Sequence, residues 1–268
     1  MKRIWIFVLF LLLFLACADV KNPVAPDVFD IVIQGYLYAY KPVRDIKITT
    51  PAQPGKPETQ YPINDARVIL SKNGLDYNLS LSPGDSGYYS YSGQELTVQP
   101  GDSFELKVLY NGKTAHAITL VPNTPKITLV SRDTLWADRE TVVSDSNKIT
   151  VKWESPDNSN AYFFTDIKPH SRFPWDDFES PSNIHRHVSF EEKWKSHEYT
   201  ITVYKSTFGG EYLFIIYQIN REYVDFLMND VYIDGKRKKP FSNIENGYGI
   251  FTAFNSDSCL FYVMGRLN

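Results

Sequence analysis

Cysteine is scarce in this chain of 268 residues, which contains only Cys17 and Cys259. Two cysteines cannot form the framework of several disulfides that stabilises many small exported domains. Cys259 lies in an apolar, strand-like stretch at 257–263, where the expected role is that of a buried structural thiol. The fold is therefore expected to be stable without a disulfide network.

An excess of positive charge is also missing. The chain has 28 basic and 31 acidic residues, which gives a net charge of −3. Proteins that bind nucleic acids need a basic face that neutralises phosphates. The one basic run, 236–239, lies between a glycine and a proline, as expected of a solvated turn. We therefore expect no nucleic-acid partner.

Signatures of common catalytic sites are absent as well. The sequence has no GxSxG, HExxH or CxxC motif and no phosphate-binding glycine loop. Paired carboxylates occur at 176–177 and 191–192, but adjacent residues on a strand point to opposite faces of the sheet. We therefore expect a protein without enzymatic activity and without a cofactor.

The first 16 residues have the layout of a targeting segment. A positive start at 1–3 precedes an apolar run that ends at Ala16. This run is shorter than the roughly 20 residues that a membrane-spanning helix needs. It has the length of the apolar region of a signal peptide.

The residues that follow indicate a lipid anchor. Leu15-Ala16-Cys17 resembles the lipobox of bacterial lipoproteins, in which the cysteine thiol receives a diacylglyceryl group and becomes the first residue after cleavage. We expect acylation of Cys17 and a tether at 17–27 that contains two prolines. The alternatives are an ordinary signal peptide with an incidental cysteine, or an uncleaved anchor.

Short strand signals separated by turns fill the rest of the chain. Aromatic residues make up 15% of the sequence, and they favour strands. Asn73-Gly74 and Asn111-Gly112 each lie between two alternating runs, a pattern that predicts β-hairpins. Gly35, inside the first strand signal, suggests either a bulge or a close backbone approach.

We therefore predict a mostly β fold of two β-sandwich modules, immunoglobulin/transthyretin-like and fibronectin-like, with one short helix near 220–228. Two prolines in Val121–Pro125 mark the boundary between the modules. The expected division is a signal peptide at 1–16, a tether at 17–27, an N-terminal β-sandwich at 28–122 and a C-terminal β-rich module at 123–268, with a long insertion at 168–195.

Two resemblances concern these modules separately. The order of short motifs in the first resembles transthyretin-like and carboxypeptidase-regulatory-like modules; the motifs are Gln34-Gly35, Asn64–Val68, Gly87–Tyr89 and Pro100–Ser103. In the second module, Trp153 followed by a turn and Tyr162 resembles the start of a fibronectin-type sandwich.

A third resemblance spans nearly the whole chain after the signal peptide. The lipoprotein signal, the helix at 222–227 and the segment Pro240–Phe251 together resemble the lipoprotein family called domain of unknown function 4249. Its most specific part runs from Ser242-Asn243-Ile244 to Gly247–Phe251. The resemblance implies an exported outer-membrane or surface lipoprotein, often encoded near TonB-dependent outer-membrane receptors. It implies no activity and no functional residues.

The insertion at 168–195 contains the one cluster that suggests a site. On a strand, His185 and His187 would point to the same face, and with Asp176 or Asp177 they could hold a divalent metal. Two histidines in a polar loop are more often solvated, so no metal is expected. The metal site remains the basis of an alternative function, a metal-assisted hydrolase.

Aromatic residues of the same insertion allow a second interpretation. Phe173, Trp175, Phe178 and Trp194 could form a surface that recognises a ligand or a partner protein. Alternatively, they fold back as a small satellite core under the loop.

The sequence as a whole indicates a lipid-anchored, non-enzymatic binding or accessory subunit of the cell envelope. We expect it at the outer membrane, on either face, beside a TonB-dependent transporter. The alternatives are the metal-assisted hydrolase and a purely structural envelope protein.

Overall fold

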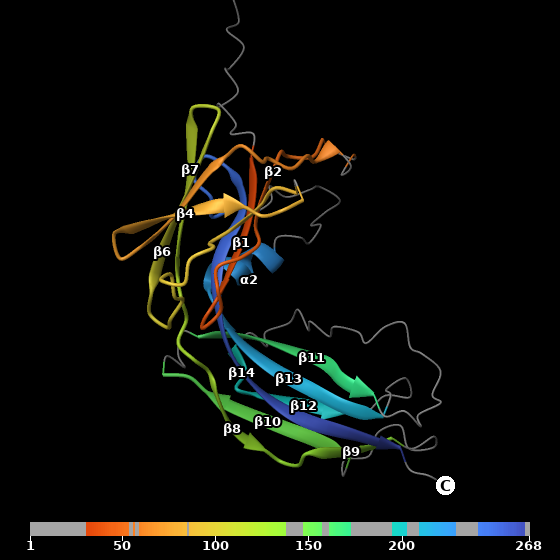
Figure 1. Cartoon of the computed structure of the whole chain (residues 1–268). Helices are drawn as coiled ribbons and strands as arrows, with labels where there is room; N and C mark the ends of the chain where they lie inside the picture. Colours follow the sequence, from red (N-terminus) through yellow and green to blue (C-terminus); the bar gives the residue numbers. More distant parts are fainter. Residues whose placement is uncertain are drawn as a thin grey trace, which may run out of the picture.

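The computed structural model describes residues 31–53, 56, 59–84, 86–137, 147–156, 161–172, 195–202, 209–228 and 241–265. Most of these residues lie in strands, and helix α2 (Arg221–Met228) lies beside the sheet (Figure 1). The predicted mostly β fold with one short helix is confirmed. Within the described ranges, no helix is long and apolar enough to span a membrane.

Seven strands form the first half of the fold. The two Asn-Gly hairpins are confirmed, because β3–β4 and β6–β7 are antiparallel neighbours. Asn73 and Gly74 both have positive φ values, as do Asn111 and Gly112, which is the geometry that these tight turns require. The strands are β1 (Val32–Tyr38), β2 (Ile46–Thr49), β3 (Arg67–Lys72), β4 (Leu75–Leu81), β5 (Tyr88–Ser90), β6 (Ser103–Tyr110) and β7 (Lys113–Leu120).

Seven further strands form the second half. They are β8 (Lys126–Val130), β9 (Thr134–Ala137), β10 (Lys148–Glu154), β11 (Tyr162–Arg172), β12 (Glu198–Thr202), β13 (Gly210–Ile219) and β14 (Tyr248–Gly265). Residues 168–172 of the predicted insertion belong to β11, which pairs with β13 as far as Arg172, and residues 173–194 lie outside the described part of the chain. Pro169 is accommodated there because β11 is the end strand of its sheet and the register shifts between Pro169 and Ser171.

One strand, β14, belongs to both halves of the fold (Figure 1). Its first residues pair in parallel with β1, from Val32↔Tyr248 to Tyr38↔Phe254. From Phe254 onward it pairs in antiparallel fashion with β13. A large sheet therefore runs through both modules in the order β11-β13-β14-β1-β2-β5-β4-β3-β6-β7, with β9 also paired to β14.

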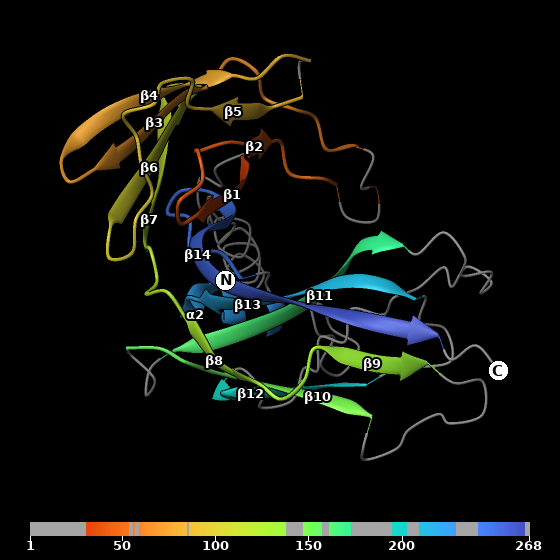
Figure 2. The ribbon, with the colours of Figure 1, turned by 60° about the horizontal axis from the view of Figure 1, so that its bottom comes forward.

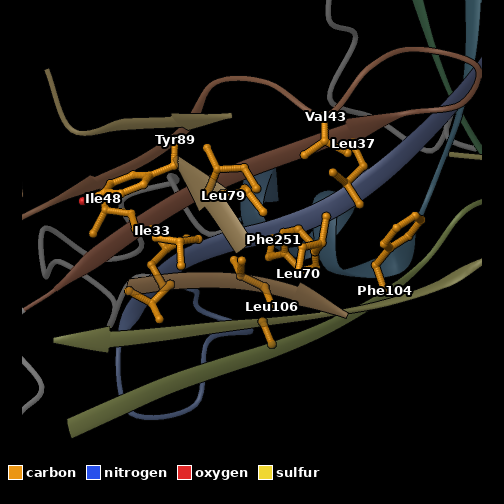
Figure 3. Packing of buried hydrophobic residues seen from close by; sticks show 14 of the residues in the cluster. Ile33, Leu37, Val43, Ile48, Leu70, Leu79, Tyr89, Phe104, Leu106 and Phe251 are labelled. Carbon is orange, nitrogen blue, oxygen red and sulfur yellow. The ribbon is translucent and has the colours of Figure 1, made fainter. Parts of the chain in front are cut away.

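The N-terminal core lies between the two parts of this sheet. Side chains of β1, β2 and β14 meet side chains of β3 and β6 in one buried cluster (Figure 3). The sheet therefore bends into two layers, as a β-sandwich requires. Its largest fully buried side chains include Tyr89, Phe104, Phe251, Ile33, Leu37, Leu70 and Leu106.

The C-terminal core lies between two separate sheets. The small sheet β12-β10-β8 faces β11, β13, β14 and β9 (Figure 2). Trp153 of β10 packs against Phe214 of β13, with ring centroids 6.4 Å apart. Phe261 of β14 lies in the same buried cluster. This arrangement is a second β-sandwich, as predicted.

Gly35 is approached closely by a side chain, and the β1–β14 register runs through it without a shift. A Cβ atom at this position would lie 2.8 Å from Cδ2 of Phe251. Gly35 pairs with Phe251 in the β1–β14 register, so the ring of Phe251 lies over the glycine. The absence of a side chain at Gly35 thus makes room for a core aromatic.

Polar side chains hold the junction between the modules. The Asn255 side-chain amide of β14 donates hydrogen bonds to the carbonyl oxygen of Pro122 (3.0 Å) and to Oγ1 of Thr124 (2.9 Å). Ser155 Oγ donates to Oε1 of Gln218 in a buried pair. The two bonds of Asn255 tie the segment that connects the modules to the shared strand, and the bond of Ser155 links the end of β10 to β13.

Candidate functional site

The residues singled out in the sequence fall mainly outside the described part of the chain. Those residues are Cys17, Phe173, Trp175, Asp176, Asp177, Phe178, His185, His187 and Trp194. Among the residues that the structure does describe, no group of three or more side chains is placed to hold a metal ion. The anchor, the aromatic surface and the metal alternative in the insertion therefore stay predictions.

Cys259 lies on strand β14, in agreement with its strand-like sequence, but it is only partly buried. Its side chain packs against the C-terminal core. Burial raises the pKa of the Cys259 thiol, and the nearby Asp257 carboxylate raises it further. Because the thiolate is the nucleophilic form, this environment suits a structural residue.

A cluster of tyrosines at the module junction was not anticipated. We use the name tyrosine cluster for Tyr36, Tyr38, Tyr162, Tyr217 and Tyr223. Four of them pack with Ile219, Val224 and Phe254, and the fifth, Tyr38, stacks on Phe254. The members come from β1, β11, β13 and α2, and the central Phe254 comes from β14.

Strand pairing brings these rings together. Tyr36 and Tyr38 are two residues apart on β1, so their side chains emerge on the same face. Tyr38 pairs with Phe254 across the parallel β1–β14 ladder, and Phe254 pairs with Ile219 of β13 on its other side. The rings therefore gather on the face of the sheet that lies opposite the N-terminal core.

Phe254 is the centre of the cluster and is only 6% exposed. Its ring stacks with Tyr38 at a centroid distance of 5.2 Å. Tyr223 meets it edge to face at 4.8 Å, and Tyr36 lies 5.9 Å away. Offset and edge-to-face arrangements of this kind are favourable for aromatic pairs. Tyr38 itself remains 44% exposed, so the cluster has an accessible side.

The tyrosine hydroxyl groups influence one another. Burial, followed by the smaller effects of Tyr223 and Tyr38, raises the pKa of Tyr36 to about 12. The pKa of Tyr38 is also raised, by burial first and then by Tyr217 and Tyr223. At neutral pH these phenols are protonated, so each can donate one hydrogen bond and accept others.

The charged groups beside the cluster have partners. Arg221 Nη1 donates to the hydroxyl of Tyr162 at 3.0 Å, and Arg221 Nε donates to Oδ1 of Asp225 at 2.9 Å. Lys195 Nζ lies 5.5 Å from the ring centroid of Tyr162. Because Asp225 balances Arg221, the edge formed by α2 carries little net charge.

Helix α2 is fixed to two strands. Oε1 of Glu222 accepts hydrogen bonds from the hydroxyl groups of Thr119 on β7 (3.0 Å) and Thr252 on β14 (3.1 Å). Asn220 directly precedes this helix. Its side-chain amide donates to the carbonyl oxygen of Leu120, and its main-chain carbonyl accepts from the amide of Tyr223. Tyr223 is thereby held in place over the sheet.

Comparison with known proteins identifies the family. The sequence model described as "Domain of unknown function (DUF4249)" matches residues 21–259. The chain belongs to this family. The match includes all five residues of the tyrosine cluster and confirms the resemblance seen in the sequence. No curated protein matches this DUF4249 chain.

Solved structures overlap with the DUF4249 chain only loosely. Tandem immunoglobulin domains of titin give a TM-score of 0.22 at 8% identity, over 88% of this chain and 96% of theirs. A second titin fragment gives a TM-score of 0.22 at 10% identity, over 89% of this chain and 98% of the fragment. A provisionally named membrane-anchored protein from Corynebacterium diphtheriae gives a TM-score of 0.18 at 10% identity, over 70% of this chain and 54% of that protein. These low scores carry no argument about function.

The raised pKa of Tyr36 leads to an alkaline prediction. In the unfolded DUF4249 chain a tyrosine loses its proton near pH 10, whereas folded Tyr36 keeps it until about pH 12. The stability from this group is therefore complete below about pH 10 and is lost as the pH rises towards 12. We expect Tyr36→Phe to make the alkaline fall in unfolding free energy shallower, as measured by urea denaturation. Tyr61→Phe, in an exposed loop, is the control, and an equal change in both variants would contradict the prediction.

Proposed function

We propose that this DUF4249 protein is a non-enzymatic binding or accessory subunit of the cell envelope. In this proposal the lipid on Cys17 holds it at the outer membrane, and it acts beside a TonB-dependent transporter. The observation that carries the binding role is the tyrosine cluster, because it places amphipathic rings on a sheet shared by both modules. Tyrosine gives a large contact area for a small loss of side-chain freedom.

The N-terminal sequence supports the anchoring part of the proposal. An apolar run that ends in Ala16-Cys17 fits a lipoprotein signal, and 17–27 can act as a tether. More than one acyl chain makes membrane attachment durable. The surface for partners would then remain close to the membrane in which a transporter lies.

The anchor is tested by replacing its cysteine. We expect Cys17→Ala to move the protein from the membrane fraction to the soluble fraction, because it removes the thiol that is acylated. The measurement is cell fractionation, combined with mass spectrometry of the mature N-terminus. Cys259→Ala is the matched control, since it removes the other cysteine of the chain and leaves the anchor intact. An unmodified Cys17 in the wild-type protein, or a Cys17→Ala variant that stays in membranes, would refute lipid anchoring.

The accessory role has a separate test. The wild-type protein is purified from membranes solubilised in mild detergent, and the co-purifying proteins are quantified. An accessory subunit should recover an outer-membrane transporter in a fixed ratio, whereas a purely structural envelope protein should not. Replacement of Tyr38, the exposed member of the cluster, should lower this ratio if the cluster contacts the transporter.

A further inference from the structure

We propose that the tyrosine cluster binds a neutral carbohydrate, with a sugar ring lying against Tyr38 and sugar hydroxyls bonded to the neighbouring phenols. This inference rests on the proposed binding function, because it names the ligand class of the same surface. The argument comes from the shape of the cluster, from its hydroxyl groups and from the charges around it.

The accessible side of the cluster is aromatic. Tyr38 is 44% exposed and is supported from below by Phe254, whose ring plane is inclined by 24° to its own. Tyr40 follows two residues later and is 66% exposed. A stacked ring that stays exposed offers a flat apolar face, and such a face suits the C–H surface of a pyranose ring.

The hydroxyl groups provide the polar part of the site. The rings of Tyr36 and Tyr223 lie 6.3 Å apart, and Tyr38 and Tyr217 both contact the ring of Phe254, so four phenols lie on the same part of the sheet. Each protonated phenol both donates and accepts, which matches the hydroxyl groups of a sugar. A few polar groups that converge over an apolar surface are typical of small-molecule sites.

The charges argue for a neutral ligand. Arg221 is paired with Asp225, and Glu222 accepts from two threonine hydroxyls. Recognition of a phosphate or a carboxylate would require a cationic side chain beside the exposed ring of Tyr38. The cations that lie over a ring of the cluster, among the residues that the structure describes, are Lys195 and Arg221, and both lie over Tyr162 at the cluster's edge. An uncharged, hydroxyl-rich molecule is the best chemical complement.

The site is also rigid. The pairs Tyr38↔Phe254 and Ile219↔Phe254 belong to continuous ladders, and the Glu222 hydrogen bonds fix α2 to two strands. Side chains held in this way lose little freedom when a ligand binds. Weak intrinsic contacts with a sugar can therefore produce measurable affinity.

The test is calorimetric titration of the full mature chain with neutral hexasaccharides, namely maltohexaose, cellohexaose, xylohexaose and mannohexaose. We expect at least one of them to saturate the protein. Tyr38→Ala should weaken that binding about tenfold, since the stacked ring is lost. Tyr36→Phe keeps the ring and removes one hydroxyl, and should weaken it about threefold. Tyr61→Ala, an exposed tyrosine outside the cluster, should bind like the wild type.

The melting temperature of each variant is measured in parallel, and the 44% exposure of Tyr38 makes a folding defect in Tyr38→Ala small. The inference is overturned if none of the four sugars binds at millimolar concentration, if Tyr38→Ala binds like the wild type, or if an unstructured peptide saturates the cluster instead. Recovery of a transporter without any sugar binding would leave the accessory function standing and remove only the carbohydrate assignment.

Discussion

Replacing Phe251 with alanine is expected to lower the free energy of unfolding by about 3–5 kcal/mol, the usual cost of deleting a fully buried phenylalanine side chain. Phe251 is completely buried in the N-terminal core (Figure 3). It lies on β14, so the cavity would open where the last strand completes the first module. Urea denaturation followed by circular dichroism measures the loss.

Gly35 provides the control for this substitution. Gly35→Ala alone should cost about 1–3 kcal/mol through overpacking, because the new Cβ would lie 2.8 Å from the ring of Phe251. In the Phe251→Ala background that ring is gone and the added methyl has room. The double variant should therefore lose less stability than the sum of the two single variants. Additive losses would contradict the contact between Gly35 and Phe251.

Gly249→Ala is expected to be even more damaging to the shared sheet. Gly249 has a φ of 108°, and a Cβ there would lie 2.0 Å from the main-chain oxygen of Ile33. The obstacle belongs to the backbone of β1, so a side-chain rotation cannot relieve it. We expect a loss of about 4 kcal/mol or more, with a large drop in soluble yield, because the β1–β14 ladder has to open. Thermal denaturation of the soluble fraction of the variant measures the loss of stability.

A substitution at a second glycine distinguishes the steric clash at Gly249 from the backbone strain of a positive φ. Gly74 also has a positive φ, 79°, but a Cβ there would meet nothing within 4 Å. Gly74→Ala should therefore cost only the strain of a left-handed alanine, about 1–2 kcal/mol. If the two variants lose the same stability, the contact between Gly249 and Ile33 is not the cause.

Local chemistry explains which parts of the fold were predictable. Asn73-Gly74 and Asn111-Gly112 each favour the positive φ values of a tight turn, so their hairpins follow from four residues. The parallel pairing of β1 with β14 has no such local signal, because Val32 and Tyr248 come from opposite ends of the chain. Pro169 does not end β11, since a sheet edge accommodates a proline that an inner strand would reject.

The tyrosine cluster could not be predicted from the sequence for the same reason, because it depends on long-range strand pairing. Tyr36 and Tyr38 look like ordinary strand residues, and so does Tyr217. Only the long-range register places Tyr38 against Phe254 and brings Tyr223 over both. The sequence instead drew attention to 168–195, where aromatic residues and histidines are close neighbours along the chain. The residues at 168–195 are neighbours along the sequence and were therefore noticed, whereas the tyrosines of the cluster are neighbours only in the folded structure.

The position of β14 has a consequence for how the protein is made. The first module lacks Ile244, Phe251 and Ala253 of its core until nearly the entire polypeptide has been synthesised. Pairing between such distant segments is slow, because a very long loop has to close first. The nascent chain therefore cannot complete the core of its first module until synthesis is almost finished. By the same logic, a nonsense mutation shortly before Gly249 would disable both modules at once.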